Sequence, residues 1–457
     1  MPLSAIPVEL LSRILKDALL DIDVMQGPKK RLKYTARLAL INRQTRAVAL
    51  ANAEIWSTIY LQWPYSAVTE YFERAKRSNI CLYLDTYQSV DAATADINIQ
   101  NWAFFLQTNM GTFTHMDLHI RSADDAEALS EALEAPAPNL QSFRLRLYQI
   151  PVSWDLFSST APKLETAYLD TCRTWDVSPF LALSTLTLRV CQTNCRRSLS
   201  VLQRTPHLKN ITLIGTGNAT DVPSPQEPHT VVFPSCHHFD VKNMKSVSVR
   251  RLMSTIKLPA LVALAIHESV ALLPFLPTVL AEHLAPANGL LVSPTRLSVE
   301  LYPNSLIIET NGTPSIRQTT DWHDVHKLQS LPRFQIHNAV VNMIASISSV
   351  LLTMAPPHVA ILNKIDHTRF RASNEPALVA LDQYMVFKDV FIAYPQIETV
   401  ELAGYVGRAA YALLVDGLPS LHAVDIKYIM PGSRVPVDDL RELEHKRNVV
   451  LRLELQR

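Results

Sequence analysis

The densest group of residues that could do chemistry is Asp321-Trp-His323-Asp324-Val-His326, where two imidazoles and two carboxylates lie within six residues. Side chains of these kinds bind divalent metal ions such as zinc, manganese or iron. The same residues also fit a short helix that Asp321 caps, with both histidines on its solvent-exposed face. The helix is the favoured interpretation, and an enzyme centred on this group is the least favoured of the functions considered.

Other motifs of known chemistry are incomplete. Phosphate-binding loops need glycines with a lysine in reach, and neither Gly215-Thr-Gly217 nor Gly404-Tyr-Val-Gly407 has the rest of such a pattern. Cys191 and Cys195 form one C-x-x-x-C motif without a second pair, which disfavours zinc. The sequence also has no G-x-S-x-G or H-E-x-x-H motif. It therefore predicts a protein that is not an enzyme and that uses no cofactor and no metal.

The composition is that of a folded chain with balanced charge. Of the 457 residues, 48% are hydrophobic and 19% are charged, which favours extensive burial. Lysine and arginine number 43 against 42 aspartates and glutamates, so no overall field would attract nucleic acid or an anionic membrane. Neither is expected as a partner. Ten glycines against 29 prolines also disfavour a dinucleotide-binding fold, which depends on glycine turns.

The cysteines and the first residues indicate a compartment. Five cysteines in a chain of this size suggest reduced thiols, and hence a cytoplasmic or nuclear protein. Charged residues interrupt the first 20 positions, so no secretory signal is predicted, and prolines and charges disqualify 258–284 as a membrane span. The basic run Lys29-Lys-Arg-Leu-Lys33 could be a nuclear import signal, although a solvated loop is favoured.

A spaced pattern recurs through the middle of the chain: an apolar residue, two variable residues, a second apolar residue, one variable residue and a third apolar residue. Successive copies begin 27, 24, 19, 25, 28 and 25 residues apart. The copies are Phe113/Met116/Leu118, Leu140/Phe143/Leu145, Leu164/Ala167/Leu169, Leu183/Leu186/Leu188, Leu208/Ile211/Leu213, Cys236/Phe239/Val241 and Leu261/Leu264/Ile266. Each copy predicts a strand with one buried face, and segments such as 126–133 and 199–203 predict helices between the strands.

The pattern resembles the leucine-rich repeat in its degenerate, cysteine-containing form, over about 300 residues. The resemblance implies an α/β fold: a right-handed solenoid with a parallel sheet on its concave face. Such repeats carry Asn, Cys or Thr eight positions after the first apolar residue, where it bonds the backbone of adjacent coils. That position holds Cys172, Cys191, Thr216 and Ser269 in four copies but Tyr148 and Met244 in two others. A structural role is therefore favoured over a reactive one for the two cysteines.

Further elements are predicted on both sides of these copies. Residues 65–77 and 99–110 fit helices and 80–84 a strand. The spacing of the copies becomes irregular between about 271 and 394. In this segment 295–310 predicts a hairpin and 338–354 a long helix, while Leu331/Phe334/Ile336 keeps the pattern. Clean copies return at Ile397/Val400/Leu402 and Leu421/Val424/Ile426. A charged helix over 437–446 and a last strand over 449–455 complete the chain.

The amino-terminal stretch is the other organising element. Pro7 suits the first turn of a helix, and Glu9 there favours the helix dipole. The apolar residues that follow form one wide stripe: Leu10, Leu11, Ile14, Leu15 and Ala18. From periodicity alone, the stripe could be buried in the chain's own core or could form a docking surface.

Two more segments follow this stretch, Leu38-Ala-Leu40-Ile41-Asn42-Arg43 through Ala49 and then Ile55-Trp56-Ser57. Together the three segments resemble the F-box over about 60 residues, and they are most similar to the F-box proteins that fungi carry in large numbers. Asn42 stands where many F-boxes have Cys, and the connection from 21 to 34 is longer than in the shortest members. Neither departure changes the apolar anchors.

The two resemblances imply a non-catalytic, substrate-recognition subunit of a Skp–cullin–F-box ubiquitin ligase. Residues 1–62 would form a small all-α F-box of three helices, 63–112 linking helices and a first strand, and 113–457 the repeat domain with an irregular insertion around 271–394. So small a module has too little core to bury every anchor alone. The residues expected to bind the Skp-type adaptor are Leu3, Ile6, Pro7, Leu10, Leu11, Ile14 and Leu15, with Leu38, Ile41 and Trp56 in support.

The alternative is a leucine-rich-repeat scaffold whose F-box-like segment only caps the repeats, without a link to ubiquitin. The protein substrate, its contact residues and any need for a phosphate mark are left open by the sequence.

Overall fold

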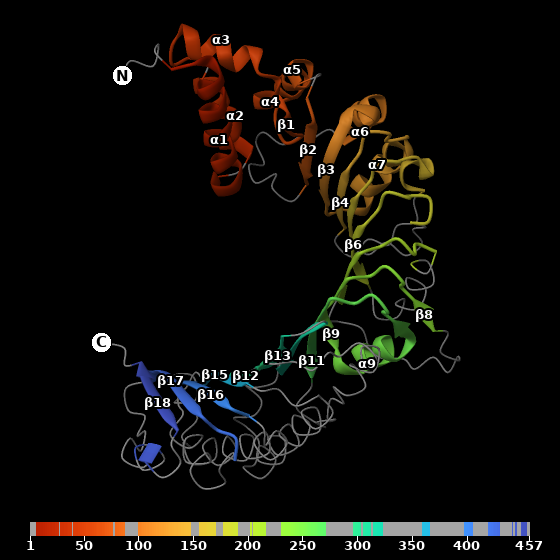
Figure 1. Ribbon diagram of the computed structural model, residues 1–457. Coiled ribbons are helices and arrows are strands. Elements are labelled where there is room, and N and C mark those ends of the chain that lie inside the picture. The colour runs from red at the N-terminus through yellow and green to blue at the C-terminus, as the bar shows by residue number, and fades with distance from the viewer. Residues whose placement is uncertain are drawn as a thin grey trace, which may run out of the picture. The chain divides into compact units, whose positions relative to one another are not determined.

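The computed structural model describes residues 6–26, 28–38, 40–75, 78–86, 99–147, 155–170, 177–190, 202, 204–215, 230–270, 296–302, 305–311, 314–322, 359–365, 397–404, 419–429, 441, 444–445 and 449–454 (Figure 1). The chain is mixed α/β, as predicted, and its strands are mostly parallel. It divides into two compact units, one of residues 1–190 and 196–208 and one of residues 191–195 and 209–457.

Unit 1 begins with four helices, one more than the three predicted: α1 (Val8–Gln26), α2 (Pro28–Leu38), α3 (Arg43–Ala51) and α4 (Ala53–Trp56). The predicted helix start near Pro7 is confirmed, because the Pro7 carbonyl oxygen accepts the Leu11 amide at 3.0 Å. Asn42 caps α3 by accepting the Thr45 amide at 2.7 Å, and Asn52 caps α4 by accepting the Glu54 amide at 3.0 Å.

The predicted loop over the basic run is wrong. Its residues, Lys29 to Lys33, lie in α2, which Pro28 opens at the helical position that proline favours. Arg31 within the run is buried, and its guanidinium donates to the Ile55 carbonyl oxygen at 3.1 Å. The charge of neighbouring residues alone could not predict this contact, because its partner Ile55 lies 24 residues later in the chain.

The rest of unit 1 alternates strands with helical segments. In chain order these are β1 (Thr58–Tyr60), α5 (Tyr65–Ala75), β2 (Ile80–Asp85), α6 (Ile99–Asn109), η2 (Met110–Thr112), β3 (Phe113–Ile120), α7 (Ala123–Glu134), β4 (Ser142–Leu147), η3 (Leu156–Ser159), β5 (Thr166–Asp170) and β6 (Thr185–Val190). The predicted helices at 65–77, 99–110 and 126–133, the predicted strand at 80–84 and the strands of the first four copies are confirmed. Strands β1 to β6 pair in parallel in chain order.

The core of unit 1 lies between this sheet and its helices, and Figure 1 shows α5, α6 and α7 on one side of β2, β3 and β4. Aromatic rings fill the space between these layers. The Phe72 ring of α5 lies 5.3 Å from that of Phe105 in α6, and the Phe143 ring of β4 lies 4.9 Å from that of Phe157 in η3. One face of the strands is therefore buried, and the other face carries polar side chains.

Unit 2 contains β7 (Asn210–Gly215), β8 (Val231–Val232), β9 (His238–Lys245), α9 (Ser246–Thr255), β10 (Ile256–Lys257), β11 (Ala263–Val270), β12 (Arg296–Tyr302), β13 (Ser305–Thr310), β14 (Ser315–Trp322), β15 (Val359–Ile365), β16 (Thr399–Gly404), β17 (Ala423–Ile429) and β18 (Val450–Glu454). Its main strand order is β7-β9-β11-β14-β13-β12-β15-β16-β17-β18. Strand β13 pairs antiparallel with β12 and β14, which confirms the predicted hairpin, and β8 pairs with β10 in a small parallel sheet. The other described strand pairs of the main order are parallel.

The apolar pattern read from the sequence matches the strand register. Its second positions stand opposite one another, as in the pairs Met116–Phe143 and Phe239–Leu264. The third positions pair in the same way, as Leu118–Leu145 does. All apolar residues of the seven copies between 113 and 266 are buried. The pattern therefore predicted both the strands and the face that each strand buries.

Strand β9 contains a bulge, because Val241 pairs with Ile266 and Met244 with Glu268, so that the bulged strand has one extra residue. Asn243 in the bulge has a φ of 53°, a left-handed conformation that Asn tolerates better than most residues. The bulge keeps Met244 buried, where simple alternation from Val241 would bury Asn243 instead.

Replacing Gly215 by alanine is expected to destabilise unit 2 by about 1–3 kcal/mol. Gly215 ends β7 against the β9 bulge, and an added Cβ would overlap the Asn243 carbonyl oxygen and lie 2.8 Å from Met244 Cγ. Urea unfolding followed by circular dichroism would measure the loss. Gly111→Ala is the matched control, since a Cβ there meets only Pro138 atoms at 3.8 Å; equal stability of the two variants would contradict the expectation.

Several predictions lie outside the described residues: the copy at Leu331/Phe334/Ile336, the helix over 338–354, most of the helices over 199–203 and 437–446, and the positions of Cys172, Cys191 and Thr216. Within the part that is described, no helix is long and apolar enough to cross a membrane.

Candidate functional site

The apolar stripe of α1 divides into an inner and an outer part. Leu11, Leu15 and Leu19 are buried, whereas Leu10 and Ile14 are 54% and 52% exposed. Leu10 and Ile14 are spaced one turn apart and therefore lie on the same side of the helix. The chain's own core thus uses only one side of the stripe.

More exposed apolar side chains lie in the segment that leads into α3, whose start is bonded to the residue before α1. Leu40 and Ile41, in the turn before α3, are 77% and 53% exposed. The Gln44 side chain donates to the Ile6 carbonyl oxygen at 3.2 Å, which holds the start of α3 next to the first turn of α1. We refer to the exposed residues Val8, Leu10, Ile14, Leu40 and Ile41 as the apolar surface.

The other residues assigned to adaptor binding are less exposed or lie elsewhere. Ile6 and Leu38 are half-buried, Pro7 is exposed, and Leu3 lies outside the described residues. Trp56 is only 4% exposed; its indole N–H donates to the Ala49 carbonyl oxygen at 2.7 Å, and its ring lies 4.8 Å from that of Tyr71. Trp56 therefore holds α3, α4 and α5 together as a core residue.

A second candidate site lies on the polar face of the unit 1 sheet. Strand register aligns its side chains in two rows across five strands, Tyr83–Asp117–Arg144–Tyr168–Thr187 and Asp85–His119–Arg146–Asp170–Arg189. Parallel strands lie about 4.8 Å apart, so charged side chains in one row are close neighbours. The second row contains only acidic and basic groups, with His119 directly beside Arg146 and Asp170 directly beside Arg189.

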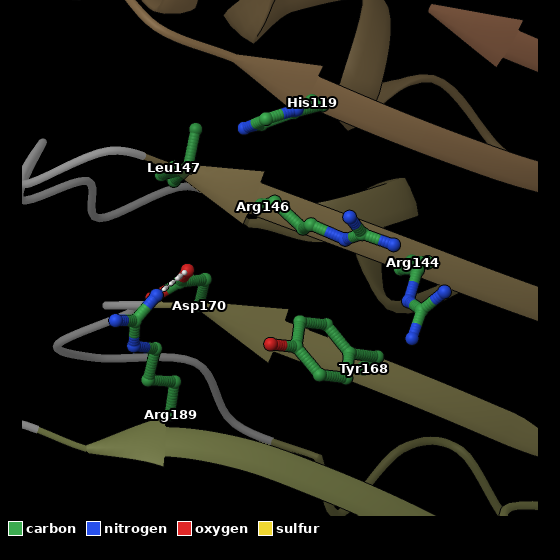
Figure 2. Close-up of a pocket in the computed structure, with 7 residues that line it drawn as sticks. All are labelled: His119, Arg144, Arg146, Leu147, Tyr168, Asp170 and Arg189. Atoms are coloured by element: carbon green, nitrogen blue, oxygen red, sulfur yellow. Dashed lines mark hydrogen bonds and ion pairs between the residues drawn. The ribbon is translucent and has the colours of Figure 1, made fainter. Parts of the chain in front are cut away.

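A cavity of about 420 Å³ opens among these rows (Figure 2). It is lined by His119, Arg144, Arg146, Leu147, Tyr168, Asp170 and Arg189. Three guanidinium groups, an imidazole and a phenol thus surround a single carboxylate. The chemistry of this lining is electrostatic and hydrogen-bonding, and favours an anion.

Ion pairs set the positions of the charged groups. Arg189 Nη1 donates to Asp170 Oδ2 at 3.1 Å, and Arg144 and Arg146 both approach Asp117 Oδ2, at 3.7 and 3.8 Å. The Arg144 guanidinium carbon lies 4.8 Å from the centre of the Tyr168 ring, a cation–π contact. His119 Nδ1 lies 3.2 Å from Asp85 Oδ1.

Burial raises the pKa of two acidic groups in these rows, Asp117 and Asp170. Desolvation raises the pKa of Asp117 despite the opposing effects of Arg146 and Arg144, and it raises the pKa of Asp170 despite Arg189. Asp170 Oδ1 is buried and accepts no hydrogen bond within the described part of the chain. The ionised form of Asp170 therefore costs folding free energy.

Replacing Asp170 by asparagine is expected to make the protein more stable than wild type at neutral pH, and the difference should vanish in acid. Well below pH 3.8 the carboxyl is protonated in both the folded and the unfolded chain. As the pH rises above 3.8, the unfolded chain ionises first, so wild-type stability falls until the raised folded pKa is passed. Melting temperatures of both proteins between pH 3 and pH 8 would check this; a gap that widens toward acid would contradict it.

The group at 321–326 does not form the predicted capped helix at its start. Asp321 lies in strand β14, and its Oδ2 is 2.6 Å from Nε2 of His267 on the neighbouring strand β11. His323, Asp324 and His326 lie outside the described residues. Within the described ranges, no three His, Cys, Asp or Glu side chains gather closely enough to hold a metal.

Burial raises the pKa of the Cys236 thiol to about 12. A thiol needs a low pKa to react as the thiolate. Cys236 is therefore a packing residue, at the first position of the copy Cys236/Phe239/Val241.

A comparison with protein-family models gives no match for the chain, and a comparison with curated proteins gives none either.

Proposed function

We propose that the chain is the substrate-recognition subunit of a Skp–cullin–F-box ubiquitin ligase, and that its apolar surface docks a Skp-type adaptor. The observation that carries the proposal is the exposure of Leu10 and Ile14 on a helix that buries Leu11, Leu15 and Leu19 in the chain's own core. Large apolar side chains grouped on a surface mark interaction sites. They occur here within the segment that resembles the F-box.

The arrangement of the helices supports docking over accidental exposure. Leu40 and Ile41 come from a different part of the chain, and the Gln44–Ile6 hydrogen bond holds their turn beside α1. Asn42 caps the helix that follows, so this turn has a defined geometry. Helix α1 and the turn before α3 thus both contribute side chains to the apolar surface, as a partner that binds by helix-in-groove packing would require.

The remainder of the chain would hold the protein substrate. The proposed architecture is a right-handed solenoid of leucine-rich-repeat type over 113–457, with an irregular insertion around 271–394, linked through 63–112 to an F-box over 1–62. Parallel pairing of successive copies and burial of their apolar positions support it. Ubiquitin transfer would then be accelerated by proximity, without a catalytic group on this chain. We propose the cytoplasm or the nucleus as its location.

Co-expression with a Skp-type adaptor tests the proposal. Wild-type chain is expected to co-purify with the adaptor through affinity capture and to elute with it as one complex in size-exclusion chromatography. Separate elution of two folded proteins would refute the docking assignment. If the chain binds the adaptor but no cullin co-purifies with the complex, the docking assignment is supported and the ligase assignment is refuted.

One set of contacts favours a second candidate, a scaffold in which the amino-terminal helices only cap the sheet. The Trp63 indole donates to the Pro28 carbonyl oxygen at 2.8 Å, and β1, which directly follows these helices, pairs with β2, so the helices adjoin the first strands of the unit 1 sheet. A segment that only capped the sheet would not explain why Leu10 and Ile14 are exposed. Under this candidate, substitution of those two residues would leave every interaction of the chain unchanged.

A further inference from the structure

The segment between Asp23 and Glu54 carries a charge that the chain as a whole lacks. Seven lysines and arginines fall in it and no aspartate or glutamate, so its charge is +7 where the whole chain has +1. The seven are Lys29, Lys30, Arg31, Lys33, Arg37, Arg43 and Arg46. The balanced total, which disfavours an anionic partner, therefore conceals a strongly basic region.

The basic run in α2 does not present its side chains consecutively, as an extended import signal would. Lys30 and Lys33 are exposed. Arg31 between them is buried and donates to the Ile55 carbonyl oxygen at 3.1 Å. Because residues three or four apart share one face of a helix, the exposed face of α2 carries Lys30, Lys33 and Arg37 in one row, over about 10 Å of helix.

The turn that follows this row is apolar and exposed. Leu40 and Ile41 are 77% and 53% exposed. The Leu40 amide donates to the Arg37 carbonyl oxygen at 2.9 Å, and the Ile41 amide donates to the Leu38 carbonyl oxygen at 3.5 Å, so the turn continues the end of α2. Ile41 stands four residues after Arg37 and therefore extends the basic row.

Two more arginines follow the turn. Arg43 opens α3 and Arg46 lies one turn further along, and both are exposed on the same face of that helix. We refer to Lys30, Lys33, Arg37, Arg43 and Arg46 as the basic cluster. Within the described part of the chain, no carboxylate forms an ion pair with any of its five side chains. The basic cluster is therefore available to an anionic partner.

We propose that the α2–α3 turn binds the surface of an anionic phospholipid bilayer, with Leu40 and Ile41 inserted toward the acyl chains and the basic cluster against the headgroup phosphates. Exposed large apolar side chains beside a face rich in lysine and arginine are typical of segments that lie on a bilayer. The cytoplasmic leaflet of cell membranes is anionic, which matches the cytoplasmic location proposed above. Each basic side chain near such a surface raises the affinity by about fivefold.

The apolar residues favour a bilayer over nucleic acid. Leu40 and Ile41 stand between Arg37 and Arg43, where a nucleic acid bound by those arginines would place its charged backbone. A bilayer offers an anionic plane with an apolar interior beneath it. One ligand thus accommodates both the charged and the apolar side chains of this turn.

The inference does not rest on the proposed function, because binding to a bilayer needs no adaptor. The two proposals share Leu40 and Ile41, which also belong to the apolar surface. An adaptor that covers these residues is therefore expected to release the chain from vesicles. If the complex of chain and adaptor binds vesicles as tightly as the free chain, Leu40 and Ile41 do not enter the bilayer and this inference is wrong; if no such complex forms, only the docking assignment is refuted.

Co-sedimentation of the full-length chain with large unilamellar vesicles tests the inference. Vesicles of equal parts phosphatidylcholine and phosphatidylserine are expected to bind the chain at least about a hundredfold more tightly than vesicles of phosphatidylcholine alone. Raising the salt concentration from about 0.1 M to about 1 M should remove most of this difference, because the Debye length falls from about 10 Å to about 3 Å. Equal binding to the two kinds of vesicle would overturn the proposal.

Two variants separate the contribution of charge from that of insertion. Lys30→Gln, Lys33→Gln and Arg37→Gln together should weaken binding to the anionic vesicles by about a hundredfold, at about fivefold for each charge. Leu40→Ser with Ile41→Ser keeps every charge and should weaken binding by about tenfold or more, because the apolar groups that enter the bilayer are lost. All five side chains are exposed, so both variants are expected to fold. Wild-type affinity in either variant would contradict the proposed contacts.

The matched control removes the same charge elsewhere. Arg121→Gln, Lys163→Gln and Arg204→Gln together change exposed residues from three other segments of unit 1 and should leave vesicle binding at the wild-type level. An equal loss in this control would show a response to total charge alone and would overturn the assignment to the α2–α3 turn. A single-stranded oligonucleotide or an acidic peptide should bind more weakly than the anionic vesicles; tighter binding of either would overturn the assignment to a bilayer.

Discussion

Replacing Leu10 and Ile14 together by alanine is expected to weaken adaptor binding by about a thousandfold. Truncating a buried apolar residue at the centre of an interface typically costs about 2 kcal/mol, or about 30-fold in affinity, and the two sites together would double that free energy. Both side chains are more than half exposed in the free chain. The substitutions should therefore leave folding intact, and isothermal titration of the purified chain with a Skp-type adaptor would measure the loss.

Two controls separate docking from general hydrophobicity. Leu181→Ala removes an even more exposed leucine, 78% exposed and remote in sequence, and should leave adaptor affinity unchanged. Leu15→Ala removes a buried leucine of the same helix and should lower stability by about 2–5 kcal/mol. If the Leu10 and Ile14 double variant binds the adaptor as tightly as wild type, the apolar surface has another role.

Replacing Trp56 by alanine is expected to cost about 3–5 kcal/mol of stability in the amino-terminal helices, the usual range for deleting a large buried aromatic side chain. Trp56 contacts the Tyr71 ring, receives the Arg74 guanidinium 4.2 Å above its own ring, and satisfies the Ala49 carbonyl. Its loss would loosen α3, α4 and α5 together. Hydrogen exchange of these helices, followed by mass spectrometry, would report the local opening free energy.

Trp56→Phe separates the ring from its hydrogen bond. The phenyl ring keeps most of the packing but leaves the buried Ala49 carbonyl oxygen without the indole donor, at a cost of about 1–3 kcal/mol. Exchange in α7, which Trp56 does not contact, should match wild type in both variants. Unchanged protection of α3 to α5 in Trp56→Ala would show that these helices do not depend on this contact.

The fold was predictable where one local signal determined it. Residues such as Phe143 and Leu145 face the core because successive strand side chains point to opposite faces, and the sequence shows this two-residue alternation of apolar residues directly. The hairpin of β12 and β13 was predictable from its turn residues. The α2 helix was not, because its basic residues resemble a solvated loop and Arg31 finds its backbone partner 24 residues later. Likewise Asp321 resembled a helix cap, but pairing with β11 extends its strand.

The charged cavity was missed for a different reason. Its arginines occupy the variable positions of the pattern, where a single copy carries no signal. Aligning consecutive copies would have placed His119 beside Arg146 and Asp170 beside Arg189, since each residue follows the third apolar position of its copy directly. The remaining information, such as the shared Asp117 and the support from Tyr168, depends on distances across strands that spacing along the chain does not give.

The order of the strands also bears on how the chain folds. Most neighbouring strands are close in sequence, so each pairing closes a short loop at small entropic cost. The β12–β13–β14 segment interrupts this order: Ala263 of β11 pairs with Ser315, 52 residues later, and Arg296 of β12 pairs with Val359, 63 residues later. Each doubling of loop length costs only about 0.6 kcal/mol of loop-closure free energy. However, the β11–β14 and β12–β15 pairings each join strands that are separated in sequence by other strands of this segment. Contact order is highest at this point, and strand pairing in unit 2 is expected to be slowest there.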